Sequence, residues 1–201
     1  KELIDKKTLA NLKIKCVVLK HPPIREKMTY AEELEYLVTN NTRNQFIIDL
    51  CRNISGNTLC LFQLVEKHGK KLHEEISSIA KNRKVFFVYG GVDSLEREKI
   101  REIVENEKDA IIIASFGTFS TGINIRNLHN IVFASPSKSK IRVLQSIGRG
   151  LRATKDKMGI LVFDIADDIS YKERRNFTLN HFFYYVCSFL EILFNFGSER
   201  F

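Results

Sequence analysis

Short apolar runs recur along this chain and are separated by longer stretches in which apolar residues have helical spacing. Each run is of strand length and has few polar positions, as in parallel strands that are buried on both faces. The predicted strands are 15–20, 58–63, 84–89, 110–115, 130–134 and 159–165. This alternation of strands and helices predicts an α/β domain, a parallel sheet with helices on both faces.

The helical stretches begin at recognisable capping residues. A first helix is predicted from Tyr30, and Asn40 is a suitable N-cap for a second helix that carries Ile47. A third helix follows the strand at 58–63. A fourth is predicted after Asp93, which together with Glu96 has the spacing of a capping box. In this helix Ile100, Ile103 and Val104 are expected to face inward. These helices supply the layers that cover the predicted sheet.

The periodic pattern divides the chain into three parts. Residues 1–14 are interpreted as a lead-in from a preceding domain, 15–170 as the α/β domain and 171–201 as a C-terminal helical extension. The segment 177–196 is rich in Phe, Tyr and Leu, but polar residues interrupt it, among them Glu191. This interruption argues against a membrane span and favours a helix packed on protein.

Composition adds a preference for polyanionic partners. The 201 residues are 44% hydrophobic and 28% charged, and the formal net charge is +8. An excess of basic residues favours nucleic acid, although here it is spread along the chain. The four cysteines form no C-x-x-C pair, so we expect neither a disulfide nor a metal site; they are Cys16, Cys51, Cys60 and Cys187.

Polar and glycine-rich segments follow two of the predicted strands. Gly90 and Gly91 come after the strand at 84–89, and a segment of hydroxyls and glycines from Ser115 to Asn124 comes after 110–115. Open α/β sheets bind ligands at the carboxyl ends of their strands. Glycine pairs also simply make turns, and a polar loop with a glycine cap would have the same composition, so both interpretations stay open at this point.

A pair of arginines stands near the end of the predicted domain. In a helix Gln145, Arg149 and Arg152 fall on one face, while Leu144, Ile147 and Leu151 fall on another. Arginine stays charged and presents a planar fork of donors that suits the charge developing on a transferring phosphoryl group. A solvated basic helix is the alternative interpretation.

The order of these segments resembles the second RecA-like domain of superfamily 2 helicases. The strand at 58–63 is similar to motif IV, the segment 115–124 to motif V, and Gln145-x-x-Gly148-Arg149-x-x-Arg152 to motif VI. Within that superfamily the stretches 114–123 and 143–145 are most similar to UvsW-type recombination helicases of tailed bacteriophages. The resemblance implies a RecA-like fold and a motor domain of an ATP-dependent DNA helicase that acts in recombination or repair.

The resemblance also assigns roles to individual residues. Catalytic roles near the γ-phosphate go to Arg149, Arg152 and Gln145. The ATP side is assigned to Gly122, Asn124 and Gly148, and nucleic-acid contacts are assigned to Ser115, Thr118, Gly90, Gly91 and Phe62. Asn124 stands where many relatives have aspartate, which leaves a metal or ribose role for it in doubt.

The sequence contains neither a Gly-x-x-x-x-Gly-Lys-Ser/Thr loop nor an Asp-Glu-x-His box. The chain alone is therefore predicted not to hydrolyse ATP, and ATP with Mg²⁺ is expected only in an intact two-domain enzyme. The resemblance implies partnership with an N-terminal RecA-like domain and with single-stranded or branched DNA. We expect a monomer without membrane contact, in the cytoplasm of the host cell if the protein is phage-encoded.

Two other functions fit part of the pattern. A non-catalytic module of the same fold would use its basic surface to hold nucleic acid or protein. The nucleotide-sugar half of a glycosyltransferase also combines a parallel sheet with glycine turns, but it would need an acidic residue rather than paired arginines. An upstream phosphate-binding loop would favour the helicase over both.

Overall fold

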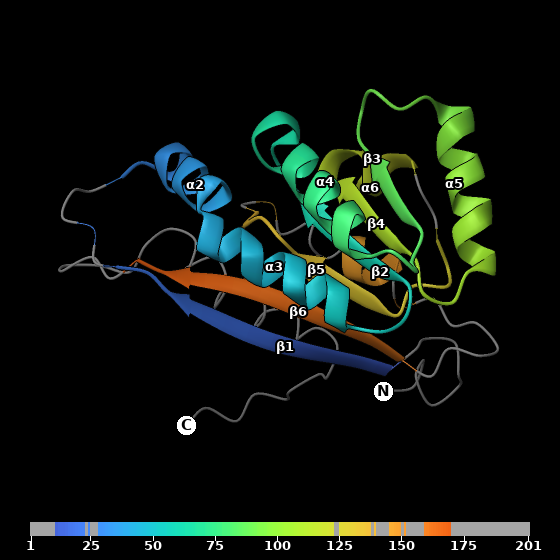
Figure 1. Cartoon of the computed structure of the whole chain (residues 1–201), viewed down its shortest axis with the longest axis horizontal. Coiled ribbons are helices and arrows are strands. Elements are labelled where there is room, and N and C mark those ends of the chain that lie inside the picture. The colour runs from blue at the N-terminus through green and yellow to red at the C-terminus, as the bar shows by residue number, and fades with distance from the viewer. Residues whose placement is uncertain are drawn as a thin grey trace, which may run out of the picture.

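The computed structural model describes residues 11–22, 24, 28–122, 125–137, 139, 145–149, 151 and 159–169, with the backbone alone at 120–122. These residues contain one parallel sheet with the strand order β1-β6-β5-β2-β4-β3 (Figure 1). The strands are β1 (Asn11–Lys20), β2 (Thr58–Phe62), β3 (Val85–Val88), β4 (Ile111–Ser115), β5 (Asn130–Phe133) and β6 (Gly159–Asp168). The predicted α/β fold with a parallel sheet is confirmed.

Helices cover both faces of the sheet, because each helix packs its apolar side against the sheet. The helices are α2 (Tyr30–Thr39), α3 (Asn41–Asn53), the π-helical turn η1 (Val65–Gly69), α4 (Lys70–Ile79), α5 (Ser94–Asn106) and α6 (Phe116–Gly122). In Figure 1 α3 and α4 lie in front of the sheet, and α2 extends from α3. Residues 145–149 are also helical.

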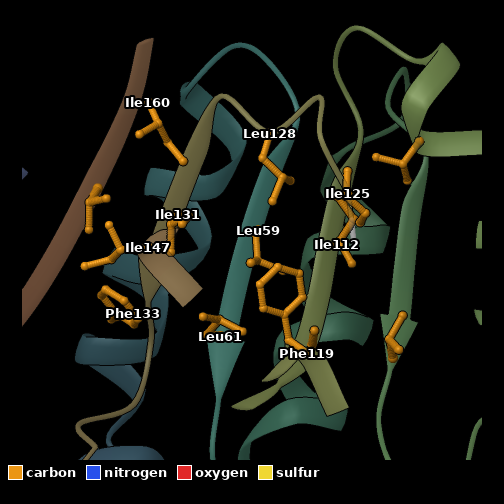
Figure 2. Close-up of a cluster of buried hydrophobic side chains, with 14 of the residues drawn as sticks. Leu59, Leu61, Ile112, Phe119, Ile125, Leu128, Ile131, Phe133, Ile147 and Ile160 are labelled. Carbon is orange, nitrogen blue, oxygen red and sulfur yellow. The ribbon is translucent and has the colours of Figure 1, made fainter. Parts of the chain in front are cut away.

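Two apolar clusters, one on each face, form the core. Cluster A, shown in Figure 2, joins α5, α6 and Ile147 to the sheet residues Leu59, Leu61, Ile112 and Ile131. Cluster B joins α3 and α4 to sheet residues that alternate with those of cluster A, such as Cys60 and Ile113. The central strands β2 and β5 are buried on both faces, which explains their unbroken apolar sequences.

Side-chain caps fix the beginnings of the helices. The Asn40 side chain accepts a hydrogen bond from the Arg43 N–H at 2.9 Å and so caps α3 as predicted. Asp93 caps α5 in the same way, accepting from the Glu96 N–H at 2.9 Å. A reciprocal capping box occurs instead at α2, between Thr29 and Glu32.

Four details differ from the sequence prediction. β1 begins at Asn11, inside the predicted lead-in, because Leu12 and Ile14 pack on cluster A. β6 continues to Asp168, and the predicted loop after Ser115 is the helix α6. Ile103, predicted to face inward from α5, is 39% exposed.

Candidate functional site

The polar segments singled out from the sequence meet at one edge of the sheet. All strands are parallel, and the register pairs Phe62 of β2 with Ser115 of β4 and Val88 of β3 with Ala114. Tyr89 directly follows β3 and precedes Gly90 and Gly91, so Tyr89 lies at the level of Ser115, the last residue of β4. The carboxyl ends of parallel strands are where open α/β sheets bind ligands.

Ser115 and Thr118 are brought together by the start of α6. The two hydroxyl oxygens are 2.8 Å apart, and the Thr118 N–H donates to Ser115 Oγ at 3.3 Å. Thr118 is only 5% exposed, while Ser115 is partly exposed. The hydroxyls therefore form one pair, with Ser115 on its more accessible side. Their predicted contact with a nucleic-acid phosphate stays a prediction.

The arginine-bearing helix is anchored as its pattern predicted. Ile147 and Leu151 are buried, at 4% and 5% exposure, and Ile147 reaches the cluster that contains Ile131 and Phe133 (Figure 2). Gln145 is exposed and Arg149 is partly exposed, so the polar face points away from the core. The amphipathic arrangement of this helix is confirmed.

Arg149 connects this helix to α6. Its guanidinium carbon lies 5.8 Å from the centre of the Phe119 ring, within the range of a cation–π interaction. Phe119 is fully buried, so its ring is a fixed support for the guanidinium group. The segments that resemble motifs V and VI thus touch, although 29 residues lie between Phe119 and Arg149 in the sequence.

Two predicted site glycines face open space. A Cβ atom built on Gly148 or on Gly90 would meet no atom within 4 Å. Close packing among the described residues therefore does not require glycine at either position. The approach of a ligand or of another domain would explain glycine at these positions, since glycine lets another group come near the backbone.

Phe62 is a core residue, and its predicted contact with nucleic acid is wrong. The side chain is fully buried in cluster B and stacks on Phe87 with ring centres 5.6 Å apart. The edge of its ring fits against Gly69 in η1, where an added Cβ would lie 2.5 Å from the ring. Because Phe62 packs in this way, β2 is apolar up to its last residue.

A chain of buried hydrogen bonds, which the sequence analysis missed, fixes the loop after β5. The Gln63 N–H donates to Ser135 Oγ at 3.2 Å, and Ser135 Oγ lies 2.9 Å from His68 Nδ1. His68 Nε2 lies 3.1 Å from Asn44 Oδ1, and the side-chain nitrogen of Asn44 donates to the Val38 carbonyl. Burial, with Arg43 and Lys71, lowers the pKa of His68 to about 3. The neutral imidazole therefore accepts from Ser135 and donates to Asn44.

A buried ion pair ties the carboxyl ends of β5 and β6 to α3. Arg43 Nε donates to both oxygens of Asp167 at 2.9 and 3.1 Å, and its Nη1 donates to the Ala134 carbonyl at 2.7 Å. His21 Nε2 adds a contact to Asp167 at 2.8 Å. Burial alone would raise the pKa of Asp167, but Arg43 and His21 outweigh it and lower that pKa. This ion pair therefore holds the carboxyl ends of β5 and β6 against α3.

Some predicted site residues lie outside the described part of the chain. Arg152 and Asn124 are among them, and at Gly122 only the helical backbone is described. Within the described ranges no group of three His, Cys, Asp or Glu side chains could hold a metal ion. None of the helices described there is long and apolar enough to cross a membrane.

Comparisons with known proteins agree with this geometry. Residues 39–154 match the family described as the helicase conserved C-terminal domain. The ATP-dependent DNA helicase UvsW of Enterobacteria phage T4 is 35% identical over 181 residues, which cover 86% of this chain and 35% of that protein. The chain thus spans about a third of the length of this relative.

Solved structures extend the similarity to the fold. The crystal structure of T4 UvsW superimposes with a TM-score of 0.74 at 32% identity, covering 92% of this chain and 40% of that one. The DNA-bound Type ISP restriction-modification enzyme LlaBIII matches at 14% identity with a TM-score of 0.62, over 94% of this chain and 14% of its own, which shows the fold alone. The family match decides against a glycosyltransferase. The chain belongs to the helicase conserved C-terminal domain family and has the RecA-like fold of such domains.

Proposed function

We propose that this chain is the C-terminal motor domain of an ATP-dependent DNA helicase or translocase that acts in recombination or repair. ATP with Mg²⁺ would lie between this domain and an N-terminal RecA-like domain, which would supply the phosphate-binding loop and the magnesium carboxylates. Single-stranded or branched DNA would cross the carboxyl edge of the sheet. We expect the whole protein to act as a monomer in the cytoplasm of the host cell.

The observation that carries this proposal is the placement of Arg149. Its helix is anchored through Ile147 and Leu151, its guanidinium group is supported by the Phe119 ring, and it remains partly exposed. A fixed, accessible guanidinium group is suited to stabilising charge on a transferring γ-phosphoryl group. Next to it, the open side of Gly148 leaves room for a nucleotide or for the facing domain.

Other residues have supporting roles in the proposal. Arg152 would be a second arginine at the γ-phosphate. Gln145 would help to order the ATP-binding cleft between the two domains. Gly122 and Asn124 would lie toward ATP. Ser115, Thr118 and the turn at Gly90-Gly91 would hold the backbone of one DNA strand. Closing and opening of the two domains would convert ATP hydrolysis into stepping, because the nucleotide states differ in their affinity for the closed form.

The test is DNA-stimulated ATP hydrolysis by the full-length protein with Arg149→Lys. Lysine keeps the charge but loses the planar fork of donors. Arginines in this role contribute about a thousandfold or more to kcat, so a loss of that order is expected with little change in nucleotide affinity. Arg52→Lys, an exposed change on α3, is the matched control and should leave turnover unchanged.

Three outcomes would contradict the proposal. Near-normal turnover of the Arg149→Lys protein would remove the catalytic role of this arginine. Robust ATP hydrolysis by the 201-residue chain alone would contradict the division of labour between the two domains, since this sequence has no phosphate-binding loop. DNA binding without any ATPase activity in the full-length protein would favour a non-catalytic binding module.

A further inference from the structure

A row of aromatic side chains extends from the core of the domain to β3, the edge strand of the sheet. Phe62 of β2 stacks on Phe87 of β3 with ring centres 5.6 Å apart, and Phe87 lies 5.1 Å from the ring of Tyr89 at an interplanar angle of 37°. His73 of α4 stacks on Phe87 at 5.0 Å with an angle of 16°. Phe62 is fully buried, whereas Phe87, Tyr89 and His73 are partly exposed. Cluster B thus ends in an accessible aromatic surface.

The position of β3 explains why this surface is accessible. β3 is the last strand in the sheet order, and among the described residues it pairs with β4 alone (Figure 1). Side chains alternate between the two faces of a strand, so Val85, Phe87 and Tyr89 point to the same face. Tyr89 is the last of the three and directly follows the carboxyl end of β3.

Tyr89 lies at the same level as the hydroxyl pair at the end of β4. Val88 pairs with Ala114, so the next residues in the same register are Tyr89 and Ser115. Ile111 and Ile113 belong to cluster B, and Ser115 continues their alternation on that face. A phosphate held at Ser115 would therefore place its nucleotide on the face that carries Tyr89.

The glycine turn after β3 is shaped around the tyrosine ring. The Val92 N–H donates to the Tyr89 carbonyl at 3.0 Å, which closes a tight turn through Gly90 and Gly91. A Cβ atom on Gly91 would lie 2.6 Å from Cε2 and 3.2 Å from Cζ of Tyr89. Gly91 is thus required for the observed position of the ring, while Gly90 faces open space.

The neighbouring imidazole contributes a neutral surface. Burial lowers the pKa of His73, and this effect exceeds the opposite influence of Glu74. At neutral pH the His73 ring is therefore uncharged, and it is suited to stacking rather than to pairing with a phosphate. An uncharged aromatic surface is suited to the base stacking that sequence-independent single-strand sites use.

We propose that Tyr89, supported by Phe87 and Gly91, is a stacking platform for an unpaired base of single-stranded DNA. This inference rests on the proposed function and adds a base contact to the backbone contacts named there. Tyr89 is better placed to stack on a base of a nucleic acid than on the adenine of ATP, for the following reason. The Arg149 helix packs through cluster A on one face of the sheet, whereas Tyr89 belongs to cluster B on the other.

The experiment compares two ligands that differ only in their bases. Fluorescence anisotropy would measure binding of the 201-residue chain to labelled oligothymidylate and to an abasic strand of the same length. Stacking of one base on an aromatic side chain changes affinity by roughly 5- to 100-fold. Tyr89→Ala should weaken binding to oligothymidylate by that factor and leave binding to the abasic strand unchanged. Tyr89→Phe, which keeps the ring, should behave as wild type.

Phe86→Ala is the matched control, because Phe86 is an aromatic residue of the same strand that packs on the opposite face. Tyr89→Leu replaces the alanine variant if that variant fails to fold. Equal losses on both strands, or no loss on oligothymidylate, would overturn the stacking role while leaving DNA binding by the domain intact. Failure of the wild-type chain to bind either strand would instead remove the DNA-binding part of the proposed function.

Discussion

The buried pair of Arg43 and Asp167 allows a quantitative test of what holds the carboxyl edge of the sheet together. Replacing Arg43 with Met removes two hydrogen bonds to the carboxylate, at 2.9 and 3.1 Å, and one to the Ala134 carbonyl at 2.7 Å. Both side chains of the pair are fully buried, so the variant would leave the Asp167 carboxyl group buried with His21 as the remaining partner described. Breaking such a pair on one side costs about 3–5 kcal/mol.

The assay is urea unfolding followed by circular dichroism at pH 7. Arg43→Met should lower the free energy of unfolding by about 4 kcal/mol. The double variant Arg43→Met, Asp167→Leu should recover most of that loss, because replacing both partners with apolar residues removes the stranded charge. Arg52→Met on the same helix is the control, since its pair with Asp49 is exposed and contributes at most about 1 kcal/mol. Additive losses in the double variant would refute this reasoning.

Two further stability predictions concern single polar groups, the half-buried Asp164 and the buried Asn57. Burial raises the pKa of Asp164 to about 7 from its ordinary 3.8, so its contribution to stability is present below pH 3.8 and is lost as the pH rises through 7. Asp164→Asn should therefore raise the free energy of unfolding by on the order of 2 kcal/mol at pH 8 and leave it unchanged at pH 4. Equal effects at the two pH values would show that ionisation of Asp164 is not the cause. The Asn57 side chain donates to three carbonyls and accepts from the Ala110 N–H, so Asn57→Ala should cost about 3 kcal/mol in urea unfolding. Asn106→Ala, which loses one exposed hydrogen bond within α5, should cost under about 1 kcal/mol, and similar costs for the two would contradict a central role for Asn57.

The sequence predicted those features whose cause is local. Strands buried on both faces must be apolar at successive positions, so β2, β4 and β5 could be located from their sequences. Asn40 and Asp93 could be identified as caps because a cap and its partner N–H lie three residues apart. The amphipathic helix at 145–149 followed from helical periodicity in the same way.

Features that depend on distant residues could not be predicted. The segment of α6 contains Gly117 and Gly122, which have low helix propensity, yet it is helical because Phe116 and Phe119 are buried in cluster A. The partners Arg43 and Asp167 lie 124 residues apart, and no pattern within either segment reveals the other. The resemblance to motif IV implies a nucleic-acid contact for Phe62, and the strand end gives no sign that Gly69 makes room for its ring in the core.

The strand order also has a consequence for how the domain is made. β1 is the first described strand to leave the ribosome, but its partner in the sheet is β6, and paired residues such as Asn11 and Gly159 lie 148 positions apart. At 5–20 residues per second, β1 waits on the order of 10 s for that partner, while β2, β4 and β5 can already pair. During this interval its apolar residues Leu12, Ile14 and Val17 have no sheet to join, so nascent chains that stop before Gly159 should be bound by chaperones more strongly than chains that extend beyond Asp168.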